Sequence, residues 1–196
     1  MTTKANQPDP RIPSDPRIPP LEPPYAPETA DALAKWMPPG SGLPPLALFR
    51  TLARHPMLRD RMRPLGSGLL SRGMLPPRVR ELLILRTSAR CGAGYEWSVH
   101  VAAYARAVGL DDATIACTVS GEPASPDDAL VLRLADELHD RSTLSDATFA
   151  AARAAFGDEG VLEIAALCGF YHLIAYVIRV AGVPAEPWAP QFSAGS

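Results

Sequence analysis

The chain reads ELLILRTSARCGAGYEWSVH from Glu81 to His100, and this stretch decides the fold. Glu81 is followed by four large aliphatic residues, 82–85, a run that is typical of a helix buried in a protein core. Glycines at 92 and 94 end that helix, and a second helix is expected to begin at about Tyr95. The stretch therefore predicts two consecutive core helices joined by a short turn.

Three ionisable side chains, Glu81, Glu96 and His100, fall inside these two predicted helices. Glu96 and His100 are four residues apart and share a helix face, and antiparallel packing brings Glu81 opposite that face. Buried ionisable groups cost several kcal/mol unless they are paired, so a chain that carries three together is expected to use them. A carboxylate beside an imidazole suits proton transfer. The alternative is an exposed Glu96–His100 pair with Glu81 as a surface acid.

Outward from this stretch, the chain reads as one helix after another, with proline, glycine and capping residues between them. Apolar residues recur at helical spacing, and we find no convincing alternation of the kind that strands show. Helices are expected over residues 28–37, 44–65 with a new start at Pro56, 77–90, 95–108, 111–119, 125–140, 145–157 and 158–181. The predicted fold class is all-α.

The first part of the chain differs from the rest in composition. Thirteen of the 22 prolines lie in the first 45 residues, and the pentapeptide DPRIP at 9–13 recurs at 15–19. Such a segment favours extended polyproline geometry over a helix or a central strand. We expect a proline-rich extended arm over residues 1–27, packed from about residue 17 onward, and one helical domain over residues 28–190. Disorder before about residue 15 is the alternative.

Charge and cysteine content limit the partners and the compartment. A net charge of -2 and a pI near 6.1 argue against a nucleic-acid partner. No apolar signal segment is found at the N-terminus, and the longest apolar stretch, 161–183, is interrupted by charged residues and a histidine. We therefore expect a buried helix rather than a membrane span. The three cysteines show neither a disulfide framework nor zinc-ligand spacing, which indicates reduced thiols in a cytoplasmic protein.

Five segments carry a further signal: RIPPL at 17–21, LFRTLA at 48–53, RELLILR at 80–86, CGAGYEWSVH at 91–100 and GFY at 169–171. Together they resemble the carboxymuconolactone decarboxylase family, which includes the AhpD-like alkylhydroperoxidase proteins, over about residues 17–187. The resemblance implies an AhpD-like helical bundle that assembles into a homo-oligomer, a dimer or larger. It also implies a small-molecule substrate, either a carboxylate, a lactone or a carbonyl compound.

The thiol-active branch of this family carries a glutamate, then a CxxC pair, then a histidine four residues after the second cysteine. Aligned on His100, the glutamate is Glu81, and the CxxC positions hold Ala93 and Glu96. Both redox cysteines are absent, so a dithiol peroxide cycle, which needs an attacking and a resolving thiol, is not expected. The pattern resembles the decarboxylase-like branch, which lacks the dithiol.

The residues and the resemblance together predict a catalytic group of Glu81, Glu96 and His100. His100 is expected to donate or accept the proton, Glu96 to orient it or act as a second acid or base, and Glu81 to hold the histidine or the substrate.

Other side chains are given supporting or structural roles. Those expected to line the substrate pocket are Cys91, Tyr95, Trp97 and His172. Arg86 and Arg90 are candidates for binding a substrate carboxylate. Cys117 and Cys168 are expected in the core, and His55 and His139 on the surface.

The predicted function is a cofactor-independent acid/base enzyme, a lyase that performs decarboxylation or a related proton transfer. No cofactor is expected because no glycine-rich phosphate loop follows a strand. No metal is expected because there is no HExxH-type helix and only one clear imidazole beside the two acids. Two alternatives remain: a peroxide-defence protein that uses the single thiol of Cys91, and a non-enzymatic binding or assembly protein. Pairing of Glu81 with an arginine would favour the latter.

Overall fold

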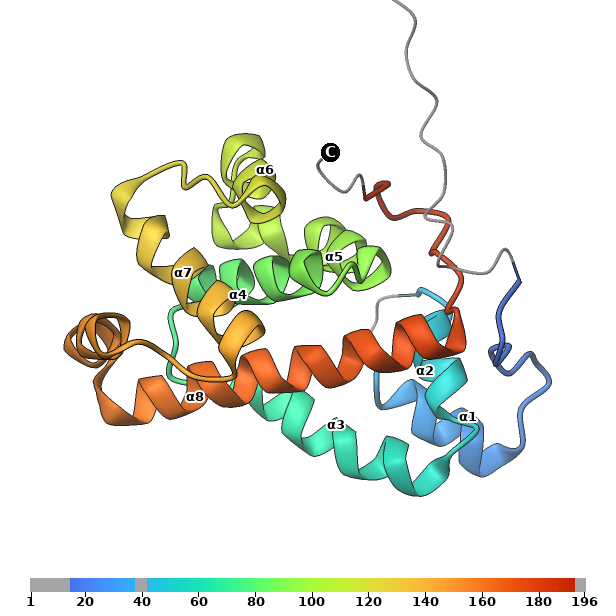
Figure 1. The fold of residues 1–196 in the computed structure, drawn as a ribbon. Coiled ribbons are helices and arrows are strands. Elements are labelled where there is room, and N and C mark those ends of the chain that lie inside the picture. The colour runs from blue at the N-terminus through green and yellow to red at the C-terminus, as the bar shows by residue number, and fades with distance from the viewer. Residues whose placement is uncertain (1–14, 38–41, 193–196) are drawn as a thin grey trace, which may run out of the picture.

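The structure, a computed structural model, describes residues 15–37 and 42–192 (Figure 1). Within these residues every regular element is helical and there is no strand, which confirms the all-α prediction. The helices are α1 (Pro27–Ala34), α2 (Ala47–Leu52), α3 (Pro56–Ser71), α4 (Pro77–Arg90), α5 (Gly94–His100), α6 (Asp112–Ser120), α7 (Pro126–Arg141) and α8 (Asp146–Ala181). A π-helical turn (Val101–Ala105) and a 3-10 turn (Arg106–Val108) continue α5.

The helices begin where local chemistry favours a start. The side chains of Asp111, Ser125 and Ser145 accept hydrogen bonds from backbone N–H groups in the first turns of α6, α7 and α8. These caps satisfy donors that have no partner inside the helix. Prolines occupy the first position of α1, α3, α4 and α7, where the missing N–H costs nothing.

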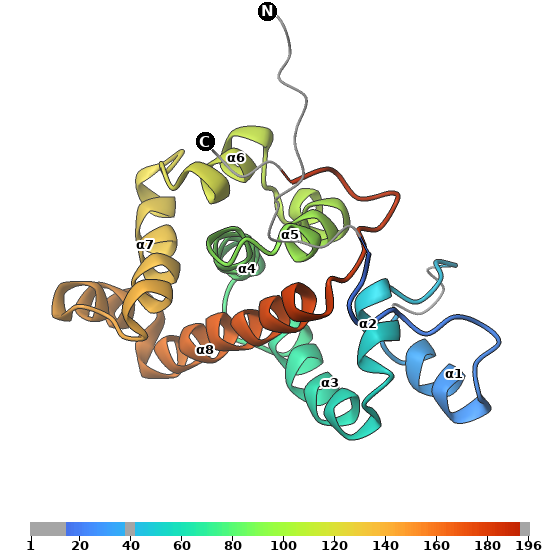
Figure 2. The ribbon, with the colours of Figure 1, turned by 45° about the vertical axis from the view of Figure 1, so that its right-hand side comes forward.

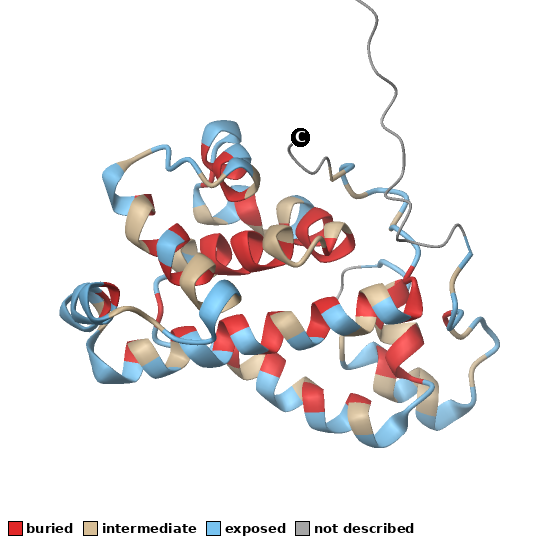
Figure 3. Ribbon diagram, in the orientation of Figure 1, coloured by how far each residue is buried: buried red, intermediate tan, exposed pale blue. Residues whose placement is uncertain are grey.

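Helix α4 is the centre of the molecule. It contacts α5, α6, α7 and α8, and Figure 2, which looks nearly along α4, shows these four helices around it. The aliphatic residues 82–85 are fully buried. Figure 3 shows buried residues along α4 and on the parts of α5 and α8 that face it. Polar groups in the middle of α4, such as Glu81, Thr87 and Ser88, are therefore held away from bulk water.

The described part of the arm packs against the body from about the predicted position. The backbone N–H of Ile18 donates to the carbonyl of Ala181 at 3.0 Å, and that of Leu21 donates to the carbonyl of Arg50 at 3.2 Å. Pro20 is buried. The first copy of the DPRIP repeat lies outside the described residues, so the expectation of disorder there concerns a part that the structure does not describe.

Helix α8 is divided by Gly157. This glycine has φ 71° and ψ 178°, a conformation outside the helical region, although the two segments run on as one element. The sequence prediction of a helix end at Gly157 and a new start at 158 is confirmed. By length and composition alone α8 can cross a membrane, but core helices of soluble proteins also meet that criterion, and 44% of its most apolar window is buried inside the molecule.

Candidate active site

His100 is the last residue of α5, and its imidazole contacts the carboxylate of Glu81 on α4. Nδ1 of His100 lies 2.7 Å from Oε2 of Glu81, and both side chains are buried. An ionised carboxylate can only accept, so Nδ1 carries the proton and donates. The predicted approach of Glu81 to the Glu96–His100 face is thus present, and the alternative of an exposed pair with a surface Glu81 is wrong.

The other ring nitrogen of His100 faces two partners. Nε2 lies 3.1 Å from the hydroxyl of Tyr171 on α8 and 3.4 Å from Oε1 of Glu96. When His100 is neutral, Nε2 accepts from the Tyr171 hydroxyl; when it is charged, Nε2–H points at Glu96 or at the tyrosine oxygen. The position of one proton therefore decides which neighbour is bound.

The charges around His100 favour its protonated form. Nε of Arg80 lies 3.2 Å from Oε1 of Glu81, so Arg80, Glu81, Glu96 and a charged His100 form a neutral set of two cations and two anions. Burial lowers the pKa of His100, but the hydrogen bonds and charges of Glu81 and Glu96 outweigh burial and raise this pKa to about 9. The imidazole of His100 is therefore protonated at neutral pH.

Two tyrosines complete the cluster. Tyr104, in the π-helical turn, lies with its ring centroid 5.0 Å from that of His100, and Tyr171 lies at 5.3 Å with its ring almost perpendicular. Burial and the nearby carboxylates raise the pKa of both phenols, so both remain protonated. Isolated π turns occur frequently at functional sites.

Sequence reasoning assigned no role to these two tyrosines. Tyr104 follows Glu96 and His100 at the same four-residue spacing, which was an available signal. Tyr171 is in the GFY segment, but its approach to His100 depends on the long-range packing of α8, which spacing does not reveal.

Tyr95 and Trp97, predicted to line the pocket, direct their polar atoms to other partners. The hydroxyl of Tyr95 donates to Glu186 at 2.7 Å and accepts from the backbone of Leu48 at 3.2 Å. Nε1 of Trp97 donates to Thr118 at 2.9 Å. Trp97 borders a cavity of about 400 Å³ whose other lining residues are Asp112, Ile115, Ala116, Val119, Ser120 and Gln191. None of these belongs to the His100 cluster, so that cavity is separate from the acid/base groups.

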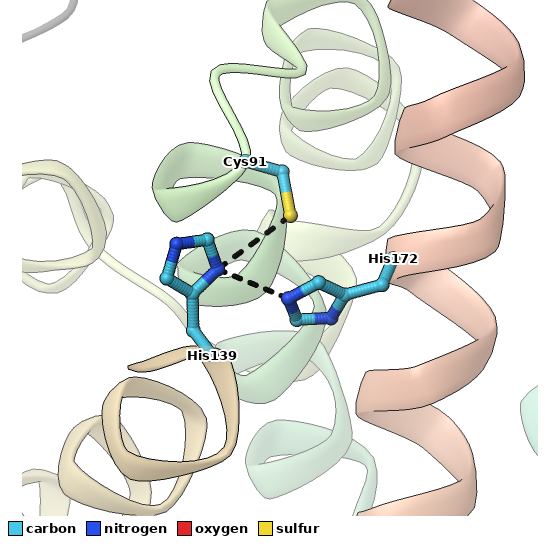
Figure 4. A group of neighbouring side chains, drawn as sticks. All are labelled: Cys91, His139 and His172. Carbon is cyan, nitrogen blue, oxygen red and sulfur yellow. Dashed lines mark hydrogen bonds between the residues drawn. The ribbon is translucent and has the colours of Figure 1, made fainter. Parts of the chain in front are cut away.

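Cys91 and His172, also predicted for the pocket, lie together with His139 in a second cluster (Figure 4). Sγ of Cys91 is 3.8 Å from Nδ1 of His139, which is 3.0 Å from Nε2 of His172. His139, predicted on the surface, is only partly exposed, because it contacts His172 on α8. Exposed His55 and buried Cys117 and Cys168 are where the sequence predicted.

The two arginines proposed for a substrate carboxylate are engaged inside the protein. Arg86 makes a two-pronged contact with Asp136, at 2.7 and 3.0 Å, and donates to the carbonyls of Thr118 and Val119. Arg90 pairs with Asp136 and Asp140. Both arginines therefore tie α4 to α6 or α7, which corrects the expectation that they are available to a substrate.

Comparisons with known proteins agree with this architecture. Two solved structures share the fold. One is an uncharacterized peroxidase-related protein from Silicibacter sp. TM1040, with a TM-score of 0.73, 17% identity, and coverage of 90% of this chain and 96% of that one. The other is a protein of unknown function from Agrobacterium tumefaciens, described as a candidate AhpD antioxidant defence protein. It has a TM-score of 0.62, 20% identity, and coverage of 69% of this chain and 94% of that one.

The comparison of sequences points to the same class. No curated protein matches the chain. Residues 56–125, which include Glu81, Glu96 and His100, match the model of the carboxymuconolactone decarboxylase family. The fold and site define an all-helical AhpD-like protein with a buried glutamate–histidine pair. Residues 56–125 thus match the carboxymuconolactone decarboxylase family, and the chain has the helical fold of AhpD-like proteins.

Proposed function

We propose that the protein is a cofactor-independent acid/base enzyme that acts on a small carboxylate, lactone or carbonyl compound. The observation that carries this proposal is the 2.7 Å contact between His100 and the fully buried Glu81, with Glu96 and Tyr171 at the opposite ring nitrogen. A charged imidazole held by a buried carboxylate is a positioned proton donor. Decarboxylation followed by protonation of carbon is the reaction that best uses such a donor.

The proposed steps balance without an additional reagent. The bond between the carboxylate carbon and its neighbour breaks, CO2 leaves, and the electron pair passes to an adjacent carbonyl or enoate of the substrate as an enolate. Nε2–H of His100 then donates its proton to the substrate carbon, and Nδ1 keeps its hydrogen bond to Glu81. The neutral imidazole accepts from the Tyr171 hydroxyl until solvent restores the proton. An enolate carbon is basic enough to take a proton from a donor whose pKa is about 9.

A substrate must reach a cluster that is nearly closed in a single chain. The side chain of His100 is 4% exposed and that of Glu96 is 10% exposed. Tyr104 and Arg80 are the half-buried members of the cluster, and Tyr104 belongs to the π-helical turn rather than to a regular helix. We propose that the entrance is at Tyr104, because its ring lies 5.0 Å from that of His100 and is partly exposed.

The proposal is tested with small β-keto acids and γ-lactone carboxylates incubated with the protein in D2O. Proton NMR follows loss of the carboxylate and gain of one deuterium at the protonated carbon. We expect turnover of one class, and a fall in kcat of about 10²-fold or more in His100→Gln. His55→Asn is the matched control, because it removes an imidazole at the N-cap of α3 and keeps a capping side chain. Equal turnover by His100→Gln would contradict the assignment.

Peroxide defence through a single thiol is the second candidate, because Cys91 lies beside His139 and one structural neighbour is described as peroxidase-related. Against it, burial raises the pKa of Cys91 to about 11 despite the opposing charges of Arg179 and Arg90. A thiol that stays protonated at neutral pH attacks peroxides slowly. Multiple-turnover consumption of an organic peroxide that is lost in Cys91→Ser and kept in Cys117→Ser would establish this alternative.

A non-enzymatic role remains the third candidate, because the Arg80–Glu81 pair is the feature expected of it. Glu81 nevertheless uses its second oxygen for His100, so the arginine does not occupy the whole carboxylate. If no substrate class is turned over in the D2O experiment and the protein is correctly folded, this alternative replaces the acid/base proposal.

A further inference from the structure

The second cluster joins three elements that the acid/base proposal does not use. Cys91 is the C-cap of α4, His139 lies in the last turn of α7, and His172 lies in α8. Figure 4 shows the three side chains pointing toward one another from their separate elements. One sulfur and two imidazoles lie close together here, although Cys91 and His139 are 48 residues apart in sequence and His139 and His172 are 33 apart.

We propose that Cys91, His139 and His172 form a binding site for one divalent transition-metal ion, of which Zn²⁺ is the best match. One ligand atom from each of the three residues lies within 4.8 Å of the other two. The atoms in contact are Sγ of Cys91, Nδ1 of His139 and Nε2 of His172. Thiolate sulfur and imidazole nitrogen are the donors that zinc takes in proteins. Oxygen-seeking ions such as Mg²⁺ and Ca²⁺ have no carboxylate among these three ligands.

The separations fit an ion placed between the three atoms. At ordinary zinc bond lengths and tetrahedral angles, two nitrogens lie about 3.3 Å apart, and a nitrogen and a sulfur about 3.6 Å apart. The corresponding separations here are 3.0 Å between His139 and His172 and 3.8 Å between His139 and Cys91. Adjustments of a few tenths of an ångström in side chains that are only partly buried convert one geometry into the other.

A backbone carbonyl determines which ring nitrogen of His172 is free to bind a metal ion. Its Nδ1 lies 2.8 Å from the carbonyl oxygen of Cys168, one helical turn earlier, and a carbonyl can only accept. Nδ1 therefore carries the proton, and Nε2 keeps the lone pair that faces His139 and Cys91. Metal-ligating histidines commonly donate their other ring N–H to a backbone carbonyl in this way. This second observation distinguishes the cluster from three polar residues that merely lie close together.

The exposure of the three side chains and the charges around them bear on whether an ion can bind. All three side chains are of intermediate burial, so an ion can enter from solvent. Arg90 is the nearby cation that interacts with both His139 and Cys91, and its charge is offset by Asp136 and Asp140. Arg179, whose charge acts on Cys91 more strongly than that of Arg90, donates to the carbonyl of Gly92 at 2.6 Å and favours the thiolate that would bind the ion. Binding replaces the thiol proton of Cys91 with the ion and releases one proton, and three protein ligands leave a fourth position for water.

The test uses Co²⁺ as a visible substitute for Zn²⁺, with the full-length protein reduced and freed of metal beforehand. We expect one equivalent of Co²⁺ to bind and to produce a sulfur-to-cobalt charge-transfer band, and Zn²⁺ to displace it. Zn²⁺ is also expected to raise the Tm of the wild-type protein, because an ion that binds only the folded state stabilises it. This readout does not depend on any enzymatic activity.

Variants assign the ligands. Cys91→Ser is expected to abolish the charge-transfer band, and His139→Gln and His172→Gln to raise the Kd by at least about tenfold. Cys117→Ser and His55→Asn, which change a cysteine and a histidine outside the cluster, are expected to bind as the wild type does. Circular dichroism confirms that each variant is folded.

Three results would contradict the proposed metal site. The first is the lack of any charge-transfer band in the wild-type protein at millimolar Co²⁺. The second is a band that survives in Cys91→Ser or is lost in Cys117→Ser. The third is Co²⁺ binding that is unaffected by both histidine variants, which would leave the cluster as a hydrogen-bonded chain from His139 through His172 to the carbonyl of Cys168.

Discussion

At the scale of single residues, the proton on His100 decides the charge of the whole buried cluster. With that proton, the charges of Arg80, Glu81, His100 and Glu96 cancel; without it, one negative charge is left in the core. A buried net charge costs several kcal/mol even after relaxation. The same proton that the proposed reaction uses therefore also stabilises the fold.

This coupling predicts a loss of stability in alkaline solution. The pKa of His100 rises from 6.5 in the unfolded chain to about 9 in the folded one, so the folded state holds an additional proton between these values. The stabilisation is fully present below pH 6.5 and is lost as the pH rises through about 9. Its size is on the order of a few kcal/mol. Urea unfolding between pH 6.5 and 9 measures this slope.

His100→Gln is the control for the alkaline effect, and its unfolding free energy is expected to vary much less across the same range. Other groups contribute little to this slope between about pH 7.5 and 8. Burial lowers the pKa of His139, so it acts near and below pH 6.5 and with the opposite sign. Asp60, Asp111, Asp128 and Glu137 have lowered pKa values and titrate in acid. The thiols of Cys91, Cys117 and Cys168 have raised pKa values and begin to contribute with the same sign as the pH approaches 9, the ordinary pKa of cysteine, so His100→Gln keeps that part of the slope. An equal slope in wild type and His100→Gln would show that another group is responsible.

Residue spacing predicted part of this site and missed the rest for a physical reason. Glu81, Glu96 and His100 lie on adjacent helices, so helical geometry and one short turn were enough to bring them together. His139 reaches Cys91 only because α7 packs on α4, and Tyr171 reaches His100 only because α8 does. Contacts between distant helices depend on the packing of the whole bundle, which a spacing rule does not contain.

At the scale of helices, Gly157 gives α8 a change of direction that other residues resist. Its φ of 71° and ψ of 178° lie in a region that is essentially restricted to glycine. Caps and glycines predicted this boundary well, as they did the starts of α6 and α7. They did not predict the π turn after His100, because no residue type marks that turn in the sequence.

We expect Gly157→Ala to destabilise the protein by about 1–3 kcal/mol, because alanine must adopt a strained backbone there. Gly68→Ala is the matched control. Gly68 is helical within α3 and has nothing within 4 Å of an added methyl group, so alanine is expected to be neutral or to stabilise by up to about 1 kcal/mol. Thermal unfolding gives the Tm of each variant. Similar Tm values for the two would show that alanine is not strained at position 157.

At the scale of the whole molecule, one face of α8 is apolar and exposed. Leu162, Leu173, Tyr176 and Val180 are between 39% and 71% exposed, and their spacings of 11, 3 and 4 residues place them on one side of the helix. Patches of exposed apolar side chains mark interaction sites in soluble proteins. The predicted homo-oligomer, which remains a prediction, therefore has a candidate interface along α8.

We expect light scattering of the wild-type protein to give at least twice the 20.9 kDa chain mass. Leu173→Glu is expected to shift the protein toward the monomer, because a charge in an apolar interface leaves an unpaired buried group. Met57→Glu is the control, since Met57 is 61% exposed but belongs to α3. A monomeric wild type, or dissociation by Met57→Glu alone, would exclude α8 as the interface.

The contact between His100 and Tyr171 also has a consequence for protein synthesis. The two residues are 71 positions apart, so at about 5–20 residues per second roughly 4–14 s pass between their addition to the nascent chain. During that interval α4 and α5 have been made, whereas α6, α7 and the part of α8 before Tyr171 are still being added, so the cover of the aliphatic side chains of α4 is incomplete. A nascent chain in this state exposes the kind of apolar segment that chaperones bind. Translation speed across the messenger region for α7 and α8 therefore sets how long each new molecule stays vulnerable to aggregation.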